Sequence, residues 1–284
     1  MFEIVYKQIP APGITEMKVK APLVARSAKP GQFIIVRTDR YGERIPLTIC
    51  DFDTAEGTVT IVTQTVGIST AKINSYEPGE MFEDFAGPLG NPSDLLEIPE
   101  DKLKEMKILF VAGGVGTAPV YPQVKWLKQH GVTADVIIGA KTKELFTYVD
   151  KMKTVGNVYL CTDDGSEGFH GMVTGLMEHL IEKEKKSYDR CIIIGPMIMM
   201  KFATLTALKY GIPVTVSLNA LMVDGTGMCG ACRVTIDGKT KFTCVDGPEF
   251  DGSKVDFDEA MRRQNMYRNN PKTNPETRKC ECHG

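Results

Sequence analysis

The sequence carries almost no net charge and contains no long hydrophobic run. Its 34 lysines and arginines nearly balance 36 aspartates and glutamates, which leaves a formal net charge of −2. This balance indicates neither a nucleic-acid partner nor a membrane surface. No stretch approaches the roughly eighteen consecutive apolar residues of a membrane-spanning helix, and residues 1–7 lack the basic and apolar segments of a signal peptide. We therefore expect a cytoplasmic protein that binds neither membrane nor nucleic acid.

The chain has eight cysteines, and a carboxylate stands at one position where a ninth would complete a known pattern. Cys229 and Cys232 are two residues apart in a glycine-rich stretch, and Cys244 follows farther along the chain. A plant-type [2Fe-2S] site has the order C-x4-C-x2-C followed by a distant cysteine. Asp224 occupies the first place of that order. Because the sequence lacks a secretory signal, we expect reduced thiols rather than disulfides.

The spacing predicts a [2Fe-2S] cluster held by three thiolates and one carboxylate. The intervening glycines let the backbone fold tightly enough to bring the ligands together. A carboxylate is a harder ligand than a thiolate and should change the potential of the cluster. Two alternatives remain open: a zinc site built on the C-x2-C pair and completed by another residue, and three buried structural cysteines. The predicted ligands are Asp224, Cys229, Cys232 and Cys244.

Residues 1–100 predict an antiparallel β-barrel. Segments 17–20, 33–37 and 58–63 are rich in β-branched residues and are separated by turns that contain proline, glycine or aspartate. Short strands of this kind pack naturally as a barrel.

Three short motifs in this barrel have the chemistry of a flavin or phosphate site. An arginine can neutralise a pyrophosphate, and a nearby hydroxyl can hydrogen-bond the edge of a flat ring. A glycine followed by hydroxyls at a helix start offers free N–H groups to a phosphate, although such hydroxyls often only cap the helix. Each motif is weak alone, and their order along the chain is more informative. The motif residues are Arg44, Pro46, Leu47 and Thr48; Gly67, Ser69 and Thr70; and Gly87, Pro88 and Leu89.

Residues 101–220 predict a parallel α/β domain. The apolar run 107–112 is typical of a buried strand, and it opens into a glycine-rich loop followed by a helix. Further strands at 134–139, 158–162 and 190–195 imply a parallel sheet that binds a dinucleotide at the carboxyl ends of its strands. The glycine pattern is looser than the full dinucleotide fingerprint. The residues expected at this edge are Gly113, Gly114, Gly116, Thr117, Ala118, Pro119, Gly195 and Pro196.

Two carboxylates follow the third of these strands. Asp163 and Asp164 could hydrogen-bond the ribose hydroxyls of NAD(H) and would repel the 2′-phosphate of NADP. The alternative is a solvated turn, which the sequence Asp-Asp-Gly favours by itself. The sequence therefore favours NAD(H) as the nicotinamide cofactor.

Taken in order, these motifs resemble those of the ferredoxin-NADP reductase superfamily. Within it, the chain is similar to the electron-transfer subunits of dihydroorotate dehydrogenase B. It is more similar to the small subunits of electron-bifurcating NADH-dependent ferredoxin:NADP oxidoreductase, also called sulfide dehydrogenase subunit beta. The resemblance covers about residues 1–265. Asp224 departs from the dihydroorotate type, which carries cysteine there, and resembles the bifurcating type.

The resemblance implies an antiparallel flavin-binding β-barrel (1–100), a parallel-sheet NAD-binding α/β domain (101–220), an iron-sulfur segment (221–250) and a C-terminal helix with a polar tail (251–284). It places FAD on the three barrel motifs and NAD(H) at the glycine loop, with Asp163 or Asp164 near the adenosine ribose. It also implies hydride exchange between NAD(H) and FAD without a side-chain acid or base, and single electrons that pass through the [2Fe-2S] cluster. No catalytic residue is therefore expected.

The resemblance further implies a heterodimer with a larger subunit that carries flavin and [4Fe-4S] clusters and reacts with NADP(H) and ferredoxin. Eight cysteines are too few for such clusters in this chain. A dihydroorotate-type or sulfide- or sulfur-reducing enzyme, a stand-alone diaphorase and a regulatory nucleotide-binding module remain as alternatives. The terminal Cys280, Cys282 and His283 predict either a surface tail or additional metal ligands.

Overall fold

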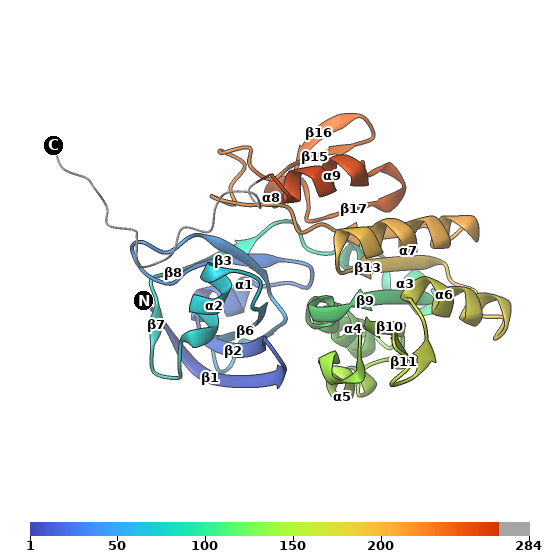
Figure 1. Cartoon of the computed structure of the whole chain (residues 1–284), viewed down its shortest axis with the longest axis horizontal. Helices are drawn as coiled ribbons and strands as arrows, with labels where there is room; N and C mark the ends of the chain where they lie inside the picture. Colours follow the sequence, from blue (N-terminus) through green and yellow to red (C-terminus); the bar gives the residue numbers. More distant parts are fainter. Residues whose placement is uncertain (267–284) are drawn as a thin grey trace.

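The computed structural model describes residues 1–266, and the predictions for Cys280, Cys282 and His283 lie outside them. Figure 1 shows N-terminal sheets on one side, a larger sheet with helices beside them, and a small C-terminal segment above the junction. Among the described residues, none of the helices is both long and apolar enough to cross a membrane.

The N-terminal part consists of two antiparallel sheets that enclose one core. The first has the strand order β5-β6-β2-β1-β7 and the second the order β4-β3-β8. Val59 and Ile61 on one sheet and Ile34 and Val36 on the other share this core, since alternate residues of a strand face the same side. The antiparallel architecture predicted from the sequence is confirmed. The elements are β1 (Phe2–Ala11), β2 (Ile14–Lys20), α1 (Pro22–Ser27), β3 (Phe33–Arg37), β4 (Ile45–Thr48), β5 (Asp51–Asp53), β6 (Thr58–Gln64), α2 (Ile68–Ser75), β7 (Met81–Phe82) and β8 (Asp84–Leu89).

The second part is a seven-stranded sheet in the order β12-β11-β10-β9-β13-β14-β17. All neighbouring strands are parallel except β17, which runs antiparallel to β14. This confirms the predicted parallel α/β fold. Its strands are β9 (Ile108–Gly113), β10 (Asp135–Ala140), β11 (Asn157–Thr162), β12 (Phe169–His170), β13 (Arg190–Ile194), β14 (Val214–Ser217) and β17 (Glu249–Asp251). Its helices are η1 (Asp94–Glu97), α3 (Glu100–Glu105), η2 (Gly114–Gly116), α4 (Thr117–Gln129), η3 (Lys143–Leu145), α5 (Val149–Lys153), α6 (Val173–Glu182) and α7 (Met197–Lys209).

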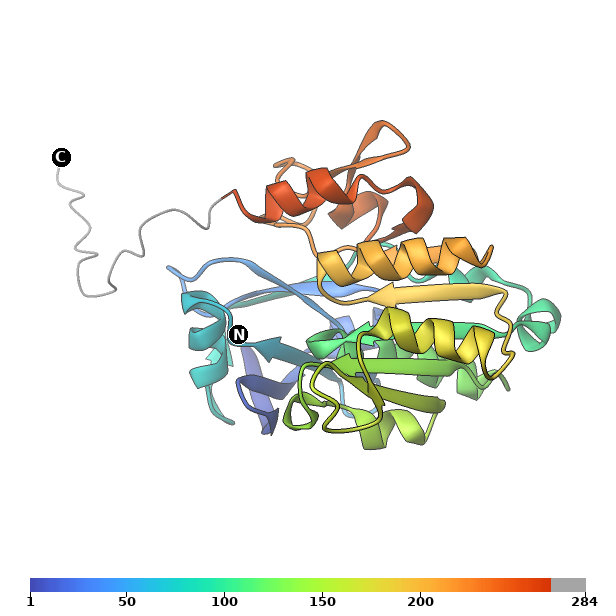
Figure 2. The ribbon, with the colours of Figure 1, turned by 45° about the vertical axis from the view of Figure 1, so that its right-hand side comes forward.

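Helices cover both faces of this sheet, which explains why its central strand is apolar throughout. Every residue of β9 is buried, as expected for a parallel strand between two helical layers. Leu109 and Val111 face the core formed with α6 and α7, whereas Ile108 and Phe110 face the core formed with α4. Figure 2 shows α6 and α7, coloured yellow to orange, along one face.

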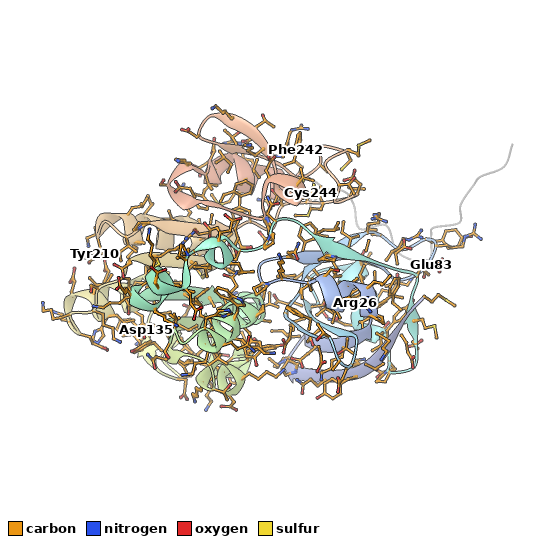
Figure 3. The ribbon with its side chains drawn as sticks, turned by 180° about the vertical axis from the view of Figure 1, so that it is seen from behind. Arg26, Glu83, Asp135, Tyr210, Phe242 and Cys244 are labelled. Carbon is orange, nitrogen blue, oxygen red and sulfur yellow. The ribbon has the colours of Figure 1, made fainter. Side chains whose placement is uncertain are left out.

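The C-terminal part is an excursion from the edge of the large sheet. The chain leaves at the end of β14 and returns at β17, where Ser217 pairs with Glu249. Between them lie the hairpin of β15 (Arg233–Ile236) and β16 (Lys239–Phe242) and the short helix α8 (Thr243–Asp246), followed after β17 by η4 (Gly252–Lys254) and α9 (Phe257–Gln264). Seen from behind in Figure 3, Phe242 and Cys244 lie above the junction of the two larger parts.

Candidate functional site

Asp224 begins the cluster loop, defined here as residues 224–232, and its carboxylate is enclosed by that loop. Oδ2 accepts the backbone N–H groups of Met228 and Cys229, each at 3.1 Å, and Oδ1 accepts that of Thr226 at 3.1 Å. Gly225 has a φ of +77°, which strains any residue with a side chain. Burial acts to raise the pKa of Asp224, but the hydrogen bonds outweigh it and lower the pKa, so the carboxylate is ionised.

The predicted cluster ligands come together as two pairs. The thiol of Cys229 donates to Oδ1 of Asp224 at 3.3 Å, and the sulfurs of Cys232 and Cys244 lie 3.3 Å apart. Cys229 is exposed, whereas Cys232 and Cys244 are buried in an apolar cluster with Phe33. Within residues 1–266, no group of three or more histidine, cysteine or acidic side chains is arranged to hold a metal ion. The structure therefore forms the pairs but does not assemble them into one ligand set.

The surroundings of the two pairs fit an iron-sulfur cluster. The N–H of Ala231 donates to the sulfur of Cys229 at 3.5 Å, and the N–H of Cys244 donates to the sulfur of Cys232 at 3.4 Å. Hydrogen bonds to sulfur are one of the means by which proteins set the potential of such clusters. Burial, followed by the neighbouring Cys232, raises the pKa of the Cys244 thiol, which disfavours its thiolate form when no cation lies beside it.

The first barrel motif lies directly beside the cluster loop. Arg44 donates to the carbonyl of Val223 at 2.8 Å and to that of Asp224 at 3.4 Å. Pro46, Leu47 and Thr48 continue along β4, and the residues of this strand are all half-buried. Among the described strands, β4 pairs only with β3, at one edge of the second sheet.

The second barrel motif is held against the loop that precedes the first. Ser69 hydrogen-bonds Glu43, which joins the start of α2 to that loop. Oγ1 of Thr70 accepts the backbone N–H groups of Val66 and Gly67 at 2.9 and 3.1 Å. Thr70 therefore caps α2 in addition to standing in the predicted phosphate site.

The third barrel motif lies against the cluster loop. Gly87, Pro88 and Leu89 form the end of β8, which pairs with β3. A Cβ atom on Gly225 would lie 2.6 Å from Ile35 and 2.9 Å from Leu89, so glycine is what allows the loop to approach these side chains. The first and third motifs are thus brought to the cluster loop, and the second motif to the first.

The glycine loop after β9 packs against the end of β13. A Cβ atom on Gly113 would lie 2.3 Å from the sulfur of Met199, and one on Gly116 would lie 2.4 Å from the carbonyl oxygen of Ile194. The backbone contact at Gly116 cannot be relieved by rotating a side chain, so this position requires glycine. The structure brings together the predicted residues of this edge, which are Gly113, Gly114, Gly116, Thr117, Ala118, Pro119, Gly195 and Pro196.

The two carboxylates after β11 differ in their contacts. Oδ1 of Asp164 accepts the N–H of Ser166 at 3.0 Å and its hydroxyl at 2.6 Å, and these bonds lower the pKa of Asp164. The carboxylate of Asp163 is exposed and makes no hydrogen bond or ion pair within residues 1–266. Asp164 therefore stabilises the turn, while Asp163 is available to a ligand.

Sequence reasoning missed an ionic contact between the barrel and the nucleotide-binding sheet. Lys151 on α5 donates to both carboxylate oxygens of Glu16 on β2, at 3.0 and 2.9 Å, and the Glu16 side chain is only 2% exposed. Beside them Tyr148 packs with Cys50, which follows the first barrel motif, and with Ala118 of the glycine loop. No sequence signal marks this pair, because its members are far apart in the chain.

The arrangement defines a class of fold, the FAD- and NAD-binding fold of the ferredoxin-NADP reductase type, here with an added iron-sulfur segment. The ferredoxin reductase in carbazole 1,9a-dioxygenase shares this fold at 13% identity and a TM-score of 0.60, over 76% of this chain and 67% of that chain. A family model described as the iron-sulfur cluster binding domain of dihydroorotate dehydrogenase B matches residues 219–256.

Two similar proteins cover almost the whole chain. A dihydroorotate dehydrogenase B (NAD(+)) electron transfer subunit homolog from Thermotoga maritima is 45% identical over 270 residues, which are 95% of this chain and 93% of the relative. A chain of the NADH-dependent reduced ferredoxin-NADP oxidoreductase, solved for insights into flavin-based electron bifurcation, has 43% identity and a TM-score of 0.87, over 94% of each chain. The chain belongs to the family of dihydroorotate dehydrogenase B electron-transfer subunits and their homologues.

Proposed function

We propose that this chain is the FAD- and [2Fe-2S]-containing subunit of a multisubunit oxidoreductase that performs electron bifurcation between NADH, NADPH and ferredoxin. When bound, NAD(H) and FAD exchange a hydride and the cluster carries single electrons. The observation that carries the proposal is the place of Asp224 in the first ligand position, where its carboxylate accepts both the N–H and the thiol of Cys229. The similarity to the bifurcating enzyme supports it.

The residues of this chain bind and orient the groups. The three barrel motifs hold FAD, the glycine loop holds NAD(H), and Asp163 contacts the adenosine ribose. Arg44 supports a short route from flavin to cluster, since it belongs to the flavin motif and bonds the carbonyl of a cluster ligand, Asp224. We also propose the domain division 1–100, 101–220, 221–250 and 251–284, of which residues 1–266 are described.

The surface around the cluster loop supports a permanent partner. Leu221, Val223, Met228 and Val245 expose between 42% and 87% of their area there. Apolar groups gathered at one place mark interaction sites on soluble proteins. We propose that the partner is a larger flavin and [4Fe-4S] subunit that reacts with NADP(H) and ferredoxin. A second candidate is the electron-transfer subunit of a dihydroorotate-oxidising enzyme, which the match at residues 219–256 favours.

The proposal is tested on the full chain with its co-purified partner under anaerobic conditions. Iron, sulfide, zinc and flavin are quantified, NADH and NADPH are added separately, and reduction is followed by visible and EPR spectroscopy. We expect NADH to reduce the flavin and a [2Fe-2S] signal to appear that Asp224→Asn alters. The matched control is Asp237→Asn at the turn between β15 and β16, which lies outside the cluster loop.

Zinc in place of iron, or an EPR signal that is the same in Asp224→Asn and wild type, would contradict the proposed ligand set. Oxidation of dihydroorotate by the complex, without reduction of ferredoxin, would favour the second candidate.

A further inference from the structure

The C-terminal helix α9 is fastened beside the cluster loop at both ends. The side chain of Asp256 accepts the N–H of Glu259 and caps the first turn, and Asp258 pairs with Lys201 on α7 at 2.7 Å. Gln264 at the other end donates to the carbonyl of Asn219 at 2.8 Å. This helix lies beyond residue 256, where the match to the iron-sulfur domain model ends.

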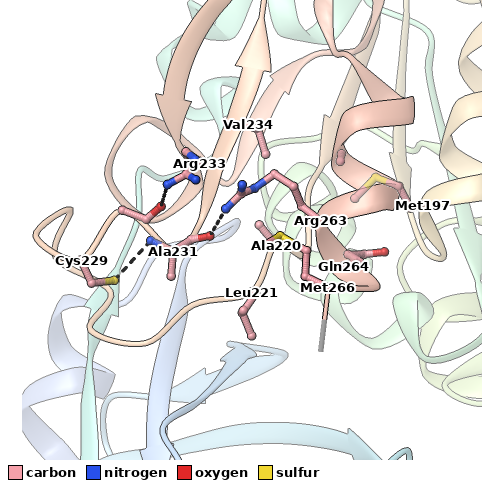
Figure 4. Close-up of a pocket in the computed structure, with 12 residues that line it drawn as sticks. Met197, Ala220, Leu221, Cys229, Ala231, Arg233, Val234, Arg263, Gln264 and Met266 are labelled. Carbon is pink, nitrogen blue, oxygen red and sulfur yellow. Dashed lines mark hydrogen bonds between the residues drawn. The ribbon is translucent and has the colours of Figure 1, made fainter. Parts of the chain in front are cut away.

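Arg263 of this helix holds the residue between two predicted ligands. Its guanidinium donates to the carbonyl of Ala231 at 3.1 Å, while the N–H of Ala231 donates to the sulfur of Cys229. Figure 4 shows these bonds and a second guanidinium, that of Arg233, which reaches the carbonyl of Gly230. The peptide groups of Ala231 are therefore held by two hydrogen bonds, one from Arg263 to its carbonyl and one from its N–H to the sulfur of Cys229.

Two arginines beside the cluster loop make no ion pair with a side chain of the described residues. Within residues 1–266, the guanidiniums of Arg233 and Arg263 bond only to backbone carbonyls. Both line a cavity of about 230 Å³ together with Cys229, Leu221 and Met266. Arg263 is half-buried, so solvent screens its charge less than that of an exposed arginine.

We propose that Arg263 is a positioning residue that raises the reduction potential of the cluster. Reduction adds one electron to the cluster, and a fixed positive charge beside Cys229 stabilises the added negative charge. The bond to Ala231 also keeps the N–H directed at the Cys229 sulfur, and hydrogen bonds to sulfur and net charge both set cluster potentials. The inference rests on the proposed function, because it requires the iron-sulfur cluster.

The test compares Arg263→Met, Arg263→Lys and Arg262→Met in the full chain with its partner. Arg262 is the matched control, since it is the exposed neighbour on the same helix. The cluster is titrated with dithionite and dye mediators and read by EPR. We expect Arg263→Met to lower the equilibrium constant for reduction of the cluster about tenfold. For a one-electron couple, this lowers the reduction potential by about 59 mV. Arg263→Lys keeps the positive charge but lacks the forked guanidinium, so its cluster potential is expected to lie between those of wild type and Arg263→Met. The potential of Arg262→Met is expected to equal that of wild type.

Hydrogen exchange supplies a readout that does not depend on the loaded cluster. The amides of residues 229–232 are expected to exchange faster in Arg263→Met, while those of α9 keep their protection, which excludes unfolding of the helix. Equal potentials in Arg263→Met and wild type, or an equal shift in Arg262→Met, would overturn this inference alone. A wild-type protein without an iron-sulfur cluster would overturn the proposed function together with it.

Discussion

Glu249 is expected to make the stability of this protein fall as the pH rises. It begins β17, near the end of the proposed iron-sulfur segment (221–250), and its Oε1 accepts a hydrogen bond from Nε2 of Gln123 on α4 at 2.6 Å. Within the described residues, its Oε2 is buried without a hydrogen-bond partner. Burial is the largest cause that raises the pKa of Glu249 to about 7, and the charge of Asp94 raises it further, whereas Ser93, Gln123 and Arg190 act against this.

The sign and size of the effect follow from proton binding. The ordinary pKa of this carboxyl is 4.5 and the folded value is about 7, so between these values the folded state holds a proton that the unfolded chain has lost. Stability is therefore fully present below the unfolded pKa and declines as the pH rises toward the folded pKa. The difference of 7 − 4.5 units corresponds to a loss of up to about 3 kcal/mol.

The perturbation is Glu249→Gln, which has the shape of the protonated acid and does not titrate. Thermal unfolding is followed by calorimetry from about pH 5 to about pH 8 on wild type and variant, so that other titrating groups cancel in the difference. The Tm of the variant minus that of wild type is expected to increase by several degrees as the pH rises through this range, given about 2–4 °C per kcal/mol. Glu97→Gln, which removes an exposed carboxylate from the same cavity of about 600 Å³, is the control. A Tm difference that stays constant with pH would refute the reasoning.

Three further outcomes are expected. Lys151→Met leaves the Glu16 carboxylate buried without its cation and should lower the free energy of unfolding by about 2–3 kcal/mol. This is below the usual range for a broken buried pair because Lys151 is half-exposed. Chemical denaturation measures the loss, and adding Glu16→Gln should recover most of it. Gly116→Ala forces a Cβ atom against a backbone carbonyl and should lower the free energy of unfolding by about 1–3 kcal/mol, with Gly211→Ala, where a Cβ meets nothing within 4 Å but φ is +70°, as the comparison for strain alone. Asp163→Ser should reduce discrimination against NADPH, measured as the ratio of kcat/KM values, whereas Asp164→Ser should mainly destabilise the turn.

The features that the sequence predicts well are those written in neighbouring residues. The run at β9 is apolar at every position and opens into glycines, which defines a buried parallel strand and its loop without any knowledge of the rest. The order of the barrel motifs is equally local. Their assignment to FAD, and that of the cluster residues to iron, stays a prediction, although the structure brings the motifs together.

The features that escaped prediction depend on contacts between distant residues. Glu16 on its strand has the pattern of a solvent-facing carboxylate, and only the packing of α5 shows that Lys151 meets it. Arg263 likewise stands in an ordinary charged helix, and its bond to Ala231 arises because α9 folds back over the loop. The pairing of β17 with β14 joins two strands that are separated by residues 218–248, and no local sequence pattern shows that these strands meet.

That pairing has a consequence for how such proteins can change. Residues 218–248 leave and rejoin the sheet at adjacent positions, because Ser217 and Glu249 face each other on antiparallel strands. Segments whose ends lie side by side can be inserted or removed with little disturbance to the rest of a fold. A tight turn between β14 and β17 would leave a plain two-domain reductase, and the reverse exchange would equip such a reductase with an outlet for single electrons. The iron-sulfur segment is thus an insertion between β14 and β17, and a single hairpin turn could replace it.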